Sequence, residues 1–133
     1  MGLRSQYTAY VAALNERRFG ELDRFVADDV VHNARPLGIQ GYRGMLEDDV
    51  ATFPDLFFGV AHLAVDGDLV AARLRFDVTP VEPFRGFAPT RTGAQFSEHV
   101  FYRFVEGRIA EVWSLIDHRR PGPTAPTSPS VRS

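Results

Sequence analysis

The chain has 133 residues, no cysteine and a net charge of -2 at neutral pH. This length suits one domain that buries about two thirds of its unfolded surface, so folding needs no disulfide. The lack of cysteine excludes thiolate catalysis and cysteine-ligated metals, and it favours the cytoplasm. Mixed charges argue against a nucleic-acid partner, because nucleic-acid-binding proteins usually present a basic face. No apolar stretch is long enough to span a bilayer, so no membrane partner is expected.

Three helices are predicted in the first half of the chain. The first is amphipathic, with apolar residues at steps of three and four: Leu3, Tyr7, Tyr10, Val11 and Leu14. It is expected to end near Gly20, and a short second helix follows around Leu22 and Val26. After a turn-rich segment at 35–41, the helical period returns from Tyr42 to Phe53, where a proline stops it.

An antiparallel sheet is predicted in the second half. Four stretches are rich in β-branched and aromatic residues, at 57–65, 69–81, 95–105 and 108–117, and a short strand ending at His32 precedes them. Asp66-Gly67 and Glu106-Gly107 suit type I′ hairpin turns. Helices followed by an antiparallel sheet indicate an α+β fold with the helices on one sheet face. We expect one domain over 1–120, a loop at 80–92 and a disordered tail at 121–133, which is rich in Pro, Ser and Thr.

The last hairpin carries the polar residues that could do chemistry. If Glu106-Gly107 is a two-residue turn, Val105 pairs with Arg108, and counting outward sets the rest of the register. One face then gathers Glu98, Tyr102, Glu111, Trp113 and Asp117. The other face holds His99, Arg103, Val112, Ser114 and Ile116. A β-bulge would move part of each set to the opposite face and could bring His99 round to Asp117.

Carboxylates beside a Trp and several Phe residues predict an acid/base pocket. Apolar surroundings raise the pKa of a carboxyl group toward neutrality, where it can both take and return a proton. An alternative is structural: Glu111 would pair with Arg103 or Arg108, and Asp117 would end its strand in water. On the first reading Asp117 is the catalytic residue.

The run FSEHVFYRFVEGRIAEVWSLID, from Phe96 to Asp117, resembles the closing hairpin of SnoaL-like polyketide cyclases. That pattern has an aromatic-Arg step, an acidic-Gly turn, Arg-Ile, Glu, Trp and a terminal Asp. Two further fragments are similar to the family: GFAPTRTG from Gly86 to Gly93, before the hairpin, and FPDL from Phe53 to Leu56, between helix and strand. Together they extend the resemblance over nearly all of the chain except the tail.

The resemblance implies a cone-shaped α+β barrel, also seen in ketosteroid isomerase and scytalone dehydratase, with helices packed on a curved sheet around a deep apolar cavity. It implies an intramolecular aldol closure without metal or cofactor on a polyketide or aromatic substrate. The acid/base role then falls on Asp117. His32 lies where relatives often place a polar residue near the cavity, and it is the second catalytic candidate, as a pocket base or a donor to the substrate; the alternative is a solvated or backbone-bonded His at a strand end. Many relatives carry an acidic residue directly after the Trp and a polar residue in the preceding strand, where this chain has Ser114 and Val100.

Further residues are expected to bind the substrate. Trp113 and Tyr102 would hold its rings, Glu111, Glu98 and His99 would flank it, and Tyr10 could donate a hydrogen bond to its carbonyl. No His pair has the spacing of a metal site. A homodimer is expected, because the outer sheet face would carry Phe101, Val112 and Ile116.

Two other functions remain open. The same fold could serve as a non-catalytic small-molecule-binding or dimerising accessory protein, because fold does not fix function. Alternatively, the cavity could support dehydration, isomerisation, hydroxylation or epoxide opening.

Overall fold

The structure is a computed structural model, and it describes residues 2–79 and 94–117. The loop expected at 80–92, the fragment from Gly86 to Gly93 and the tail at 121–133 lie outside these residues. The division into a domain over 1–120 and a tail therefore stays a prediction. The elements, in chain order, are helix α1 (Leu3–Asn15), the 3-10 helix η1 (Phe19–Arg24), strand β1 (Val26–His32), helix α2 (Gly38–Thr52) and strands β2 (Gly59–Asp66), β3 (Leu69–Val78), β4 (Ala94–Val105) and β5 (Arg108–Asp117).

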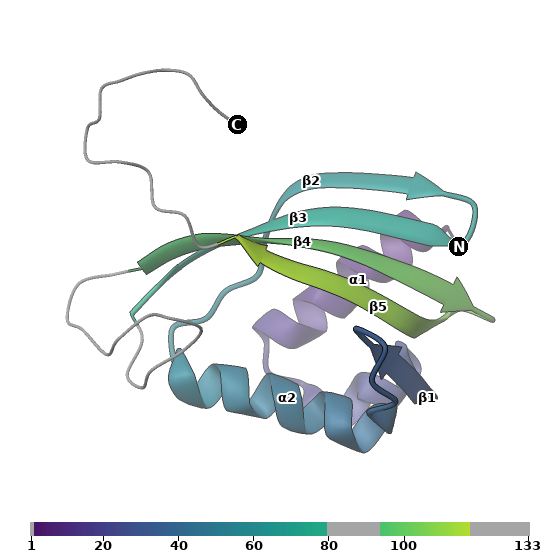
Figure 1. The fold of residues 1–133 in the computed structure, drawn as a ribbon, viewed down its shortest axis with the longest axis horizontal. Helices are drawn as coiled ribbons and strands as arrows, with labels where there is room; N and C mark the ends of the chain where they lie inside the picture. Colours follow the sequence, from purple (N-terminus) through teal and green to yellow (C-terminus); the bar gives the residue numbers. More distant parts are fainter. Residues whose placement is uncertain (1, 80–93, 118–133) are drawn as a thin grey trace.

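The five strands form one curved sheet in the order β1-β5-β4-β3-β2. Only the pairing of β1 with β5 is parallel. Helices α1 and α2 lie on the same side of the sheet, which curls over them (Figure 1). This confirms the predicted α+β class, with N-terminal helices on a mainly antiparallel sheet. Neither these helices nor any other helix in the described ranges combines the length and apolar character of a membrane span.

The helices differ from the prediction at their ends. Helix α1 stops at Asn15 rather than near Gly20, because Arg17 takes a left-handed backbone with φ of 60°. The Arg17 guanidinium donates to the carbonyl of Leu56 at 2.6 Å, which ties this helix end to the segment before β2. The second helix ends at Arg24, so Val26 belongs to β1. Helix α2 begins at Gly38, so part of the expected turn segment is helical.

The two hairpin turns follow different patterns. Glu106 and Gly107 have φ of 52° and 81°. The φ angle is therefore positive at both central residues of the turn, as predicted for type I′. In the first hairpin Asp66 pairs with Leu69, so the turn residues are Gly67 and Asp68 rather than Asp66 and Gly67. Of these two, only Gly67 has positive φ, at 62°. A glycine first in the turn is the pattern of type II′, so the predicted turn is wrong by one residue.

A β-bulge in β5 overturns most of the predicted register of the last hairpin. The pairs Val105 with Arg108 and Phe104 with Ile109 are as expected. The next residue of β4, Arg103, then lies opposite Glu111, which leaves Ala110 as the extra residue in β5. Here the Ile109 N–H donates at 2.7 Å to the carbonyl of Phe25, the residue directly before β1.

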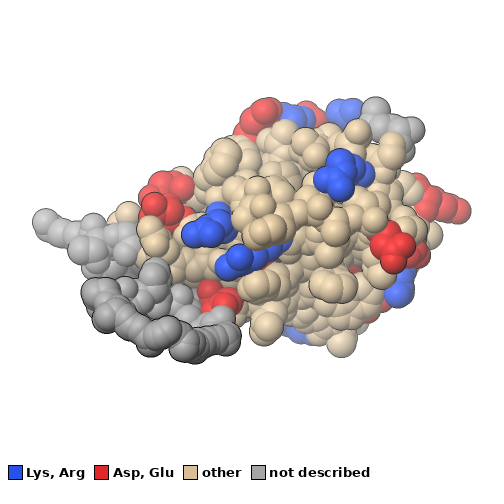
Figure 2. Space-filling model, turned by 90° about the horizontal axis from the view of Figure 1, so that it is seen from above, with Lys and Arg blue, Asp and Glu red and all other residues tan. Residues whose placement is uncertain are grey.

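Beyond the bulge, every residue of β5 faces the side opposite to the one expected. The concave face, toward the helices, keeps Glu98 and Tyr102 of β4 but gains Val112, Ser114 and Ile116 of β5. The outer face holds Glu111, Trp113 and Asp117. The core lies between the concave face and the two helices and includes fully buried Tyr7, Val26, Val70 and Ile109. On the face shown in Figure 2, acidic and basic groups are interspersed among neutral residues.

Candidate active site

A pocket of about 650 Å³, counted to its open mouth, lies between the concave sheet face and helices α1 and α2. Every layer of the fold contributes to its lining. From the helices come Tyr10, Leu14, Tyr42, Met45, Leu46 and Asp49; from the segment before β2 come Phe53, Leu56 and Phe58; from the strands come His32, Phe76, Phe96, Glu98, Tyr102, Val112, Ser114 and Ile116. Its lining combines apolar and aromatic side chains with a few polar groups, which is typical of small-molecule sites.

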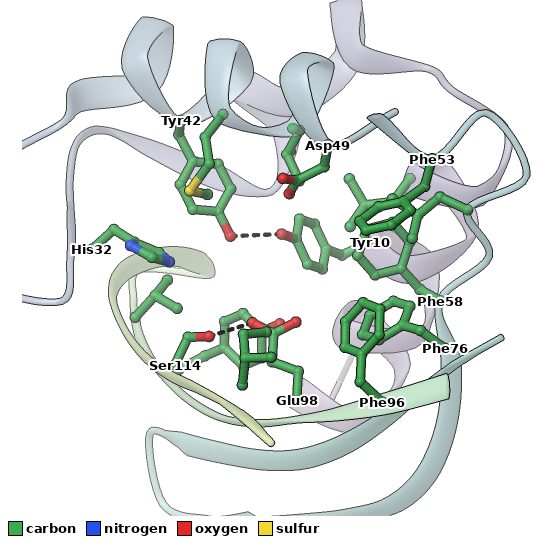
Figure 3. A pocket seen from close by; sticks show the side chains of 17 residues that line it. Tyr10, His32, Tyr42, Asp49, Phe53, Phe58, Phe76, Phe96, Glu98 and Ser114 are labelled. Carbon is green, nitrogen blue, oxygen red and sulfur yellow. Dashed lines mark hydrogen bonds between the residues drawn. The ribbon is translucent and has the colours of Figure 1, made fainter. Parts of the chain in front are cut away.

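One end of the pocket is polar (Figure 3). Glu98 of β4 and Ser114 of β5 point into it from the sheet, and the Ser114 hydroxyl donates a hydrogen bond to the Glu98 carboxylate. Asp49 faces them from α2, and His32 lies at the end of β1 beside Tyr42, with 6.2 Å between ring centroids. The described lining therefore combines a hydrogen-bonded carboxylate with a second carboxylate, an imidazole and phenols.

All four tyrosines of the chain are buried beside this polar end. The hydroxyls of Tyr10 and Tyr42 lie 2.7 Å apart, and Tyr7 donates to Tyr102 at 3.2 Å. Burial raises the pKa of Tyr10, Tyr42 and Tyr102 well above the usual value, and the negative charge of Glu98 adds to this in each case. The hydroxyls therefore stay protonated at neutral pH and can act as hydrogen-bond donors.

The raised tyrosine pKa values predict base denaturation. An unfolded tyrosine loses its proton near a pKa of about 10, whereas the buried groups keep theirs at higher pH. Above pH of about 10 the unfolded state binds fewer protons, so the free energy of unfolding falls as pH rises. We expect tyrosinate absorbance to appear only together with loss of the circular dichroism of the fold. Ionisation of the tyrosines in a still folded protein would contradict this placement.

The other end of the pocket is aromatic. Phe76 and Phe96 stack with ring centroids 4.9 Å apart. Phe58 meets Phe76 edge to face at 5.4 Å, and Phe53 lies 5.8 Å from Phe96. In Figure 3 these four rings gather on the side away from His32. Such a surface suits a planar apolar ring system, because offset and edge-on ring contacts are favourable.

Four of the residues expected in the site line this pocket: Tyr10, His32, Glu98 and Tyr102. The β-bulge lies in β5, so it does not change the face on which Glu98 and Tyr102 of β4 lie. Their roles in catalysis or binding stay predictions.

The other expected site residues lie outside the pocket lining: Glu111, Trp113, Asp117 and His99. The β-bulge turns the three β5 residues outward, and His99 lies on the same outer face, with Nε2 at 3.9 Å from Asp117 Oδ2. Arg103 lies 3.6 Å from Glu111, as in the structural alternative, and its guanidinium carbon lies 5.2 Å from the Trp113 ring centroid. The predicted grouping of Glu111, Trp113 and Asp117 with Glu98 on one sheet face is therefore wrong.

Sequence reasoning missed three polar residues of the pocket: Tyr42, Asp49 and Ser114. A signal for Asp49 existed, because it interrupts the apolar stripe of α2 seven residues after Tyr42, which places both on one helix face. For Ser114 the residue pattern of β5 gave no signal without knowledge of the bulge, but the family resemblance did, because it leads one to expect an acidic residue at this position. No group of three or more metal-ligating side chains occurs within residues 2–79 and 94–117.

Comparison with known proteins matches the sequence and the fold of this chain to one family. The family model of the SnoaL-like polyketide cyclases matches residues 4–120. A SnoaL-like polyketide cyclase from Agrobacterium tumefaciens is 46% identical, with a TM-score of 0.85 over 88% of this chain and 92% of that chain.

Two Streptomyces structures are more distant. IdmH of S. antibioticus, a candidate polyketide cyclase, is 25% identical, with a TM-score of 0.75 over 86% of this chain and 91% of that one. AclR of S. galilaeus, a candidate hydroxylase, is 25% identical, with a TM-score of 0.73 over 87% and 89%. Comparison with curated proteins gave no match. The family match over residues 4–120 and the 46% identity show that the chain belongs to the SnoaL-like polyketide cyclase family.

Proposed function

We propose that the protein is a cofactor-free enzyme that closes a ring in an aromatic or polycyclic polyketide-type ketone by an intramolecular aldol reaction, with Glu98 as the acid/base group. The observation that carries this proposal is the hydrogen-bonded Glu98 carboxylate, which lies in a pocket with phenol donors at one end and stacked Phe rings at the other. We place the reaction in the cytoplasm as a step of secondary metabolism, such as antibiotic biosynthesis.

The proposed reaction begins when the Glu98 carboxylate takes a proton from a carbon next to a substrate carbonyl. The electron pair of the broken C–H bond delocalises onto the carbonyl oxygen and gives an enolate. The enolate oxygen accepts a hydrogen bond from the pair of Tyr10 and Tyr42. Because Tyr10 and Tyr42 share one hydrogen bond, one of their two hydroxyl protons is available for a ligand oxygen. The enolate carbon then attacks a second carbonyl, a C–C bond forms, and the resulting alkoxide takes the proton back from Glu98.

The residue at position 114 supports Glu98, rather than a residue of β5, as the acid/base group. The family resemblance leads one to expect an acidic residue directly after the Trp, and this chain has Ser114 there. Position 114 faces the pocket, and its hydroxyl binds the carboxylate of Glu98 from the neighbouring strand. The chain thus presents a carboxylate at this end of the pocket from β4 instead of β5.

Hydroxylation is the second candidate, because AclR, a candidate hydroxylase, shares the fold at 25% identity. The product mass separates the two reactions. An aldol closure leaves the substrate mass unchanged or, after dehydration, lowers it by one water, whereas hydroxylation adds one oxygen atom.

The experiment that tests the proposal measures exchange of the α-protons of 1-tetralone, a bicyclic aromatic ketone, with deuterium from the solvent. Proton NMR follows the loss of the α-proton signal with and without the protein. A catalysed exchange that depends on Glu98 supports the proposal. Binding of the ketone without catalysed exchange would favour the alternative, a small-molecule-binding protein of the same fold.

We further propose that the protein forms a homodimer through the outer face of β4 and β5. Phe101 lies opposite Trp113 on this face, and Leu115 is the next outward residue of β5. These side chains are 52%, 36% and 68% exposed, and together they form an apolar strip. The expected Val112 and Ile116 do not belong to it, because both turn inward.

The dimer proposal predicts that Leu115→Arg yields a monomer, because a charge would enter the apolar strip in place of its most exposed side chain. Analytical ultracentrifugation of both proteins measures the change. Phe57→Arg is the control, because Phe57 is 63% exposed but lies before β2 and outside this strip. A monomeric parent protein, or a dimeric Leu115→Arg variant, would contradict this interface.

A further inference from the structure

A tight turn directly after the pocket residue His32 holds Asn33. His32 and Arg35 exchange two backbone hydrogen bonds of 2.9 Å, which leaves Asn33 and Ala34 as the two turn residues. Both have positive φ, at 49° and 67°. Asparagine is among the few residues with a side chain that tolerate this conformation. The turn therefore fixes the direction in which the Asn33 amide projects from β1.

The Asn33 side chain acts as an additional strand partner for β5. Its Nδ2 donates to the carbonyl of Ser114 at 3.1 Å, and its Oδ1 accepts from the Ser114 N–H at 2.8 Å. The Asn33 backbone N–H also donates to the carbonyl of Val112 at 2.8 Å. The parallel pairing of β1 with β5 ends at His32 and Val112, so the amide continues the ladder by one more residue. Both backbone groups of Ser114 are thus held by one side chain.

We propose that Asn33 is a positioning residue for Glu98 and acts through Ser114. The chain of contacts is direct: Asn33 fixes the backbone of Ser114, and the Ser114 hydroxyl donates to the Glu98 carboxylate. A hydroxyl that donates to a carboxylate favours its charged form. The two hydrogen bonds between the Asn33 amide and the Ser114 backbone form a clamp, and this clamp thereby helps to set the pH at which Glu98 gains its proton. The effect of Asn33 on the titration of Glu98 does not depend on the proposed function. Only the catalytic consequence of that titration rests on it.

Other titratable groups lie around Glu98 and must stay constant in the test. They are His32 from β1, Tyr10 and Tyr7 from α1, Tyr42 and Asp49 from α2, and Tyr102 from β4. Asn33 is exposed, and within the described residues the hydrogen bonds of its side-chain amide go to Ser114 and to none of these groups. Its replacement therefore changes the Ser114 contact and leaves these groups in place.

The chain contains a matched control for the clamp. Asn15, at the end of α1, holds Phe58 in the same two-bond manner: its Nδ2 donates to the Phe58 carbonyl at 3.3 Å, and its Oδ1 accepts from the Phe58 N–H at 2.7 Å. Phe58 belongs to the aromatic end of the pocket. Loss of this clamp costs comparable backbone hydrogen bonds but leaves the Ser114 hydroxyl untouched.

The test is an NMR titration of the glutamate carboxyl signals in the parent protein, three single variants and one double variant, with the Glu98 signal assigned by its absence in Glu98→Gln. Ser114→Ala should raise the Glu98 titration midpoint by about one pH unit, because a hydrogen bond to the charged form is lost. Asn33→Gly should raise it by roughly half a unit, and Gly accepts the positive φ, so the backbone turn is kept. Asn15→Ala should leave it unchanged.

The double variant separates positioning from general destabilisation. If Asn33 acts through Ser114, Asn33→Gly adds nothing to the midpoint once Ser114→Ala has removed the hydroxyl. A shift of less than about 0.2 unit in Asn33→Gly, an equal shift in Asn15→Ala, or a further shift in the double variant would overturn the proposal. If Asn33→Gly does not fold, an unchanged midpoint in Ser114→Ala still overturns it. The titration needs no turnover, so failure of the proposed enzyme activity would leave this result independent.

Discussion

Replacement of Glu98 by Gln is expected to lower the rate of α-proton exchange from 1-tetralone by about a hundredfold or more. A positioned general acid/base group typically contributes a factor of roughly 10² to 10⁴. The amide of Gln keeps the size of the side chain and can still accept a hydrogen bond from the Ser114 hydroxyl, but it cannot take a proton. The loss should therefore appear in kcat, with little change in KM. Proton NMR measures the exchange rate over a range of ketone concentrations.

The fold of the Glu98→Gln variant must be intact for this result to count. Circular dichroism and the thermal unfolding midpoint give that control. A variant that folds normally and exchanges protons at the parent rate would show that Glu98 is not the acid/base group, whatever the true substrate is.

The largest loss of stability is expected for Phe76→Ala, which should lower the free energy of unfolding by about 3 kcal/mol or more. Phe76 is 5% exposed and joins the two halves of the aromatic end, because it contacts Phe96 on one side and Phe58 on the other. Removal of its ring takes away both contacts and leaves a cavity that the stiff sheet cannot fill. Denaturant unfolding of both proteins measures the difference.

Phe57→Ala is the control for Phe76→Ala. The Phe57 ring is 63% exposed, so its removal should change the free energy of unfolding by no more than about 0.5 kcal/mol. A cost below about 1 kcal/mol for Phe76→Ala would mean that the aromatic end is loosely packed, and its role as a binding surface for rings would lose its basis.

The periodicity of the sequence was enough to predict the order of the elements. The apolar spacing of α1, the β-rich stretches and the turn at Glu106-Gly107 all appear in the structure, because each depends on neighbouring residues only. Element ends were less predictable. The left-handed backbone at Arg17, which ends α1, is stabilised by a hydrogen bond to Leu56 far along the chain.

The site was predicted only in part because sheet faces depend on register. One extra residue, Ala110, reverses the direction of every later side chain in β5. This single bulge moved Asp117 and Trp113 to the outer face and brought Ser114 into the pocket. The hydrophobic pattern of β5 gave little warning, because Val112, Trp113, Leu115 and Ile116 place apolar side chains on both faces.

The pocket also depends on contacts that no local pattern reveals. Tyr10 and Tyr42 come from two helices, and their hydroxyls meet only because both helices pack on one side of the sheet. Their spacing indicates buried helix faces, which is correct, but it does not indicate that two polar groups of different helices form one donor pair.

The central claim is that chemistry takes place on the concave face at Glu98 and not on the outer face at Asp117. The most direct test compares 1-tetralone exchange in Glu98→Gln and Asp117→Asn under identical conditions. We predict a loss of about a hundredfold or more in Glu98→Gln and a rate within about twofold of the parent in Asp117→Asn. The reverse pattern, with exchange lost in Asp117→Asn and kept in Glu98→Gln, would contradict the account.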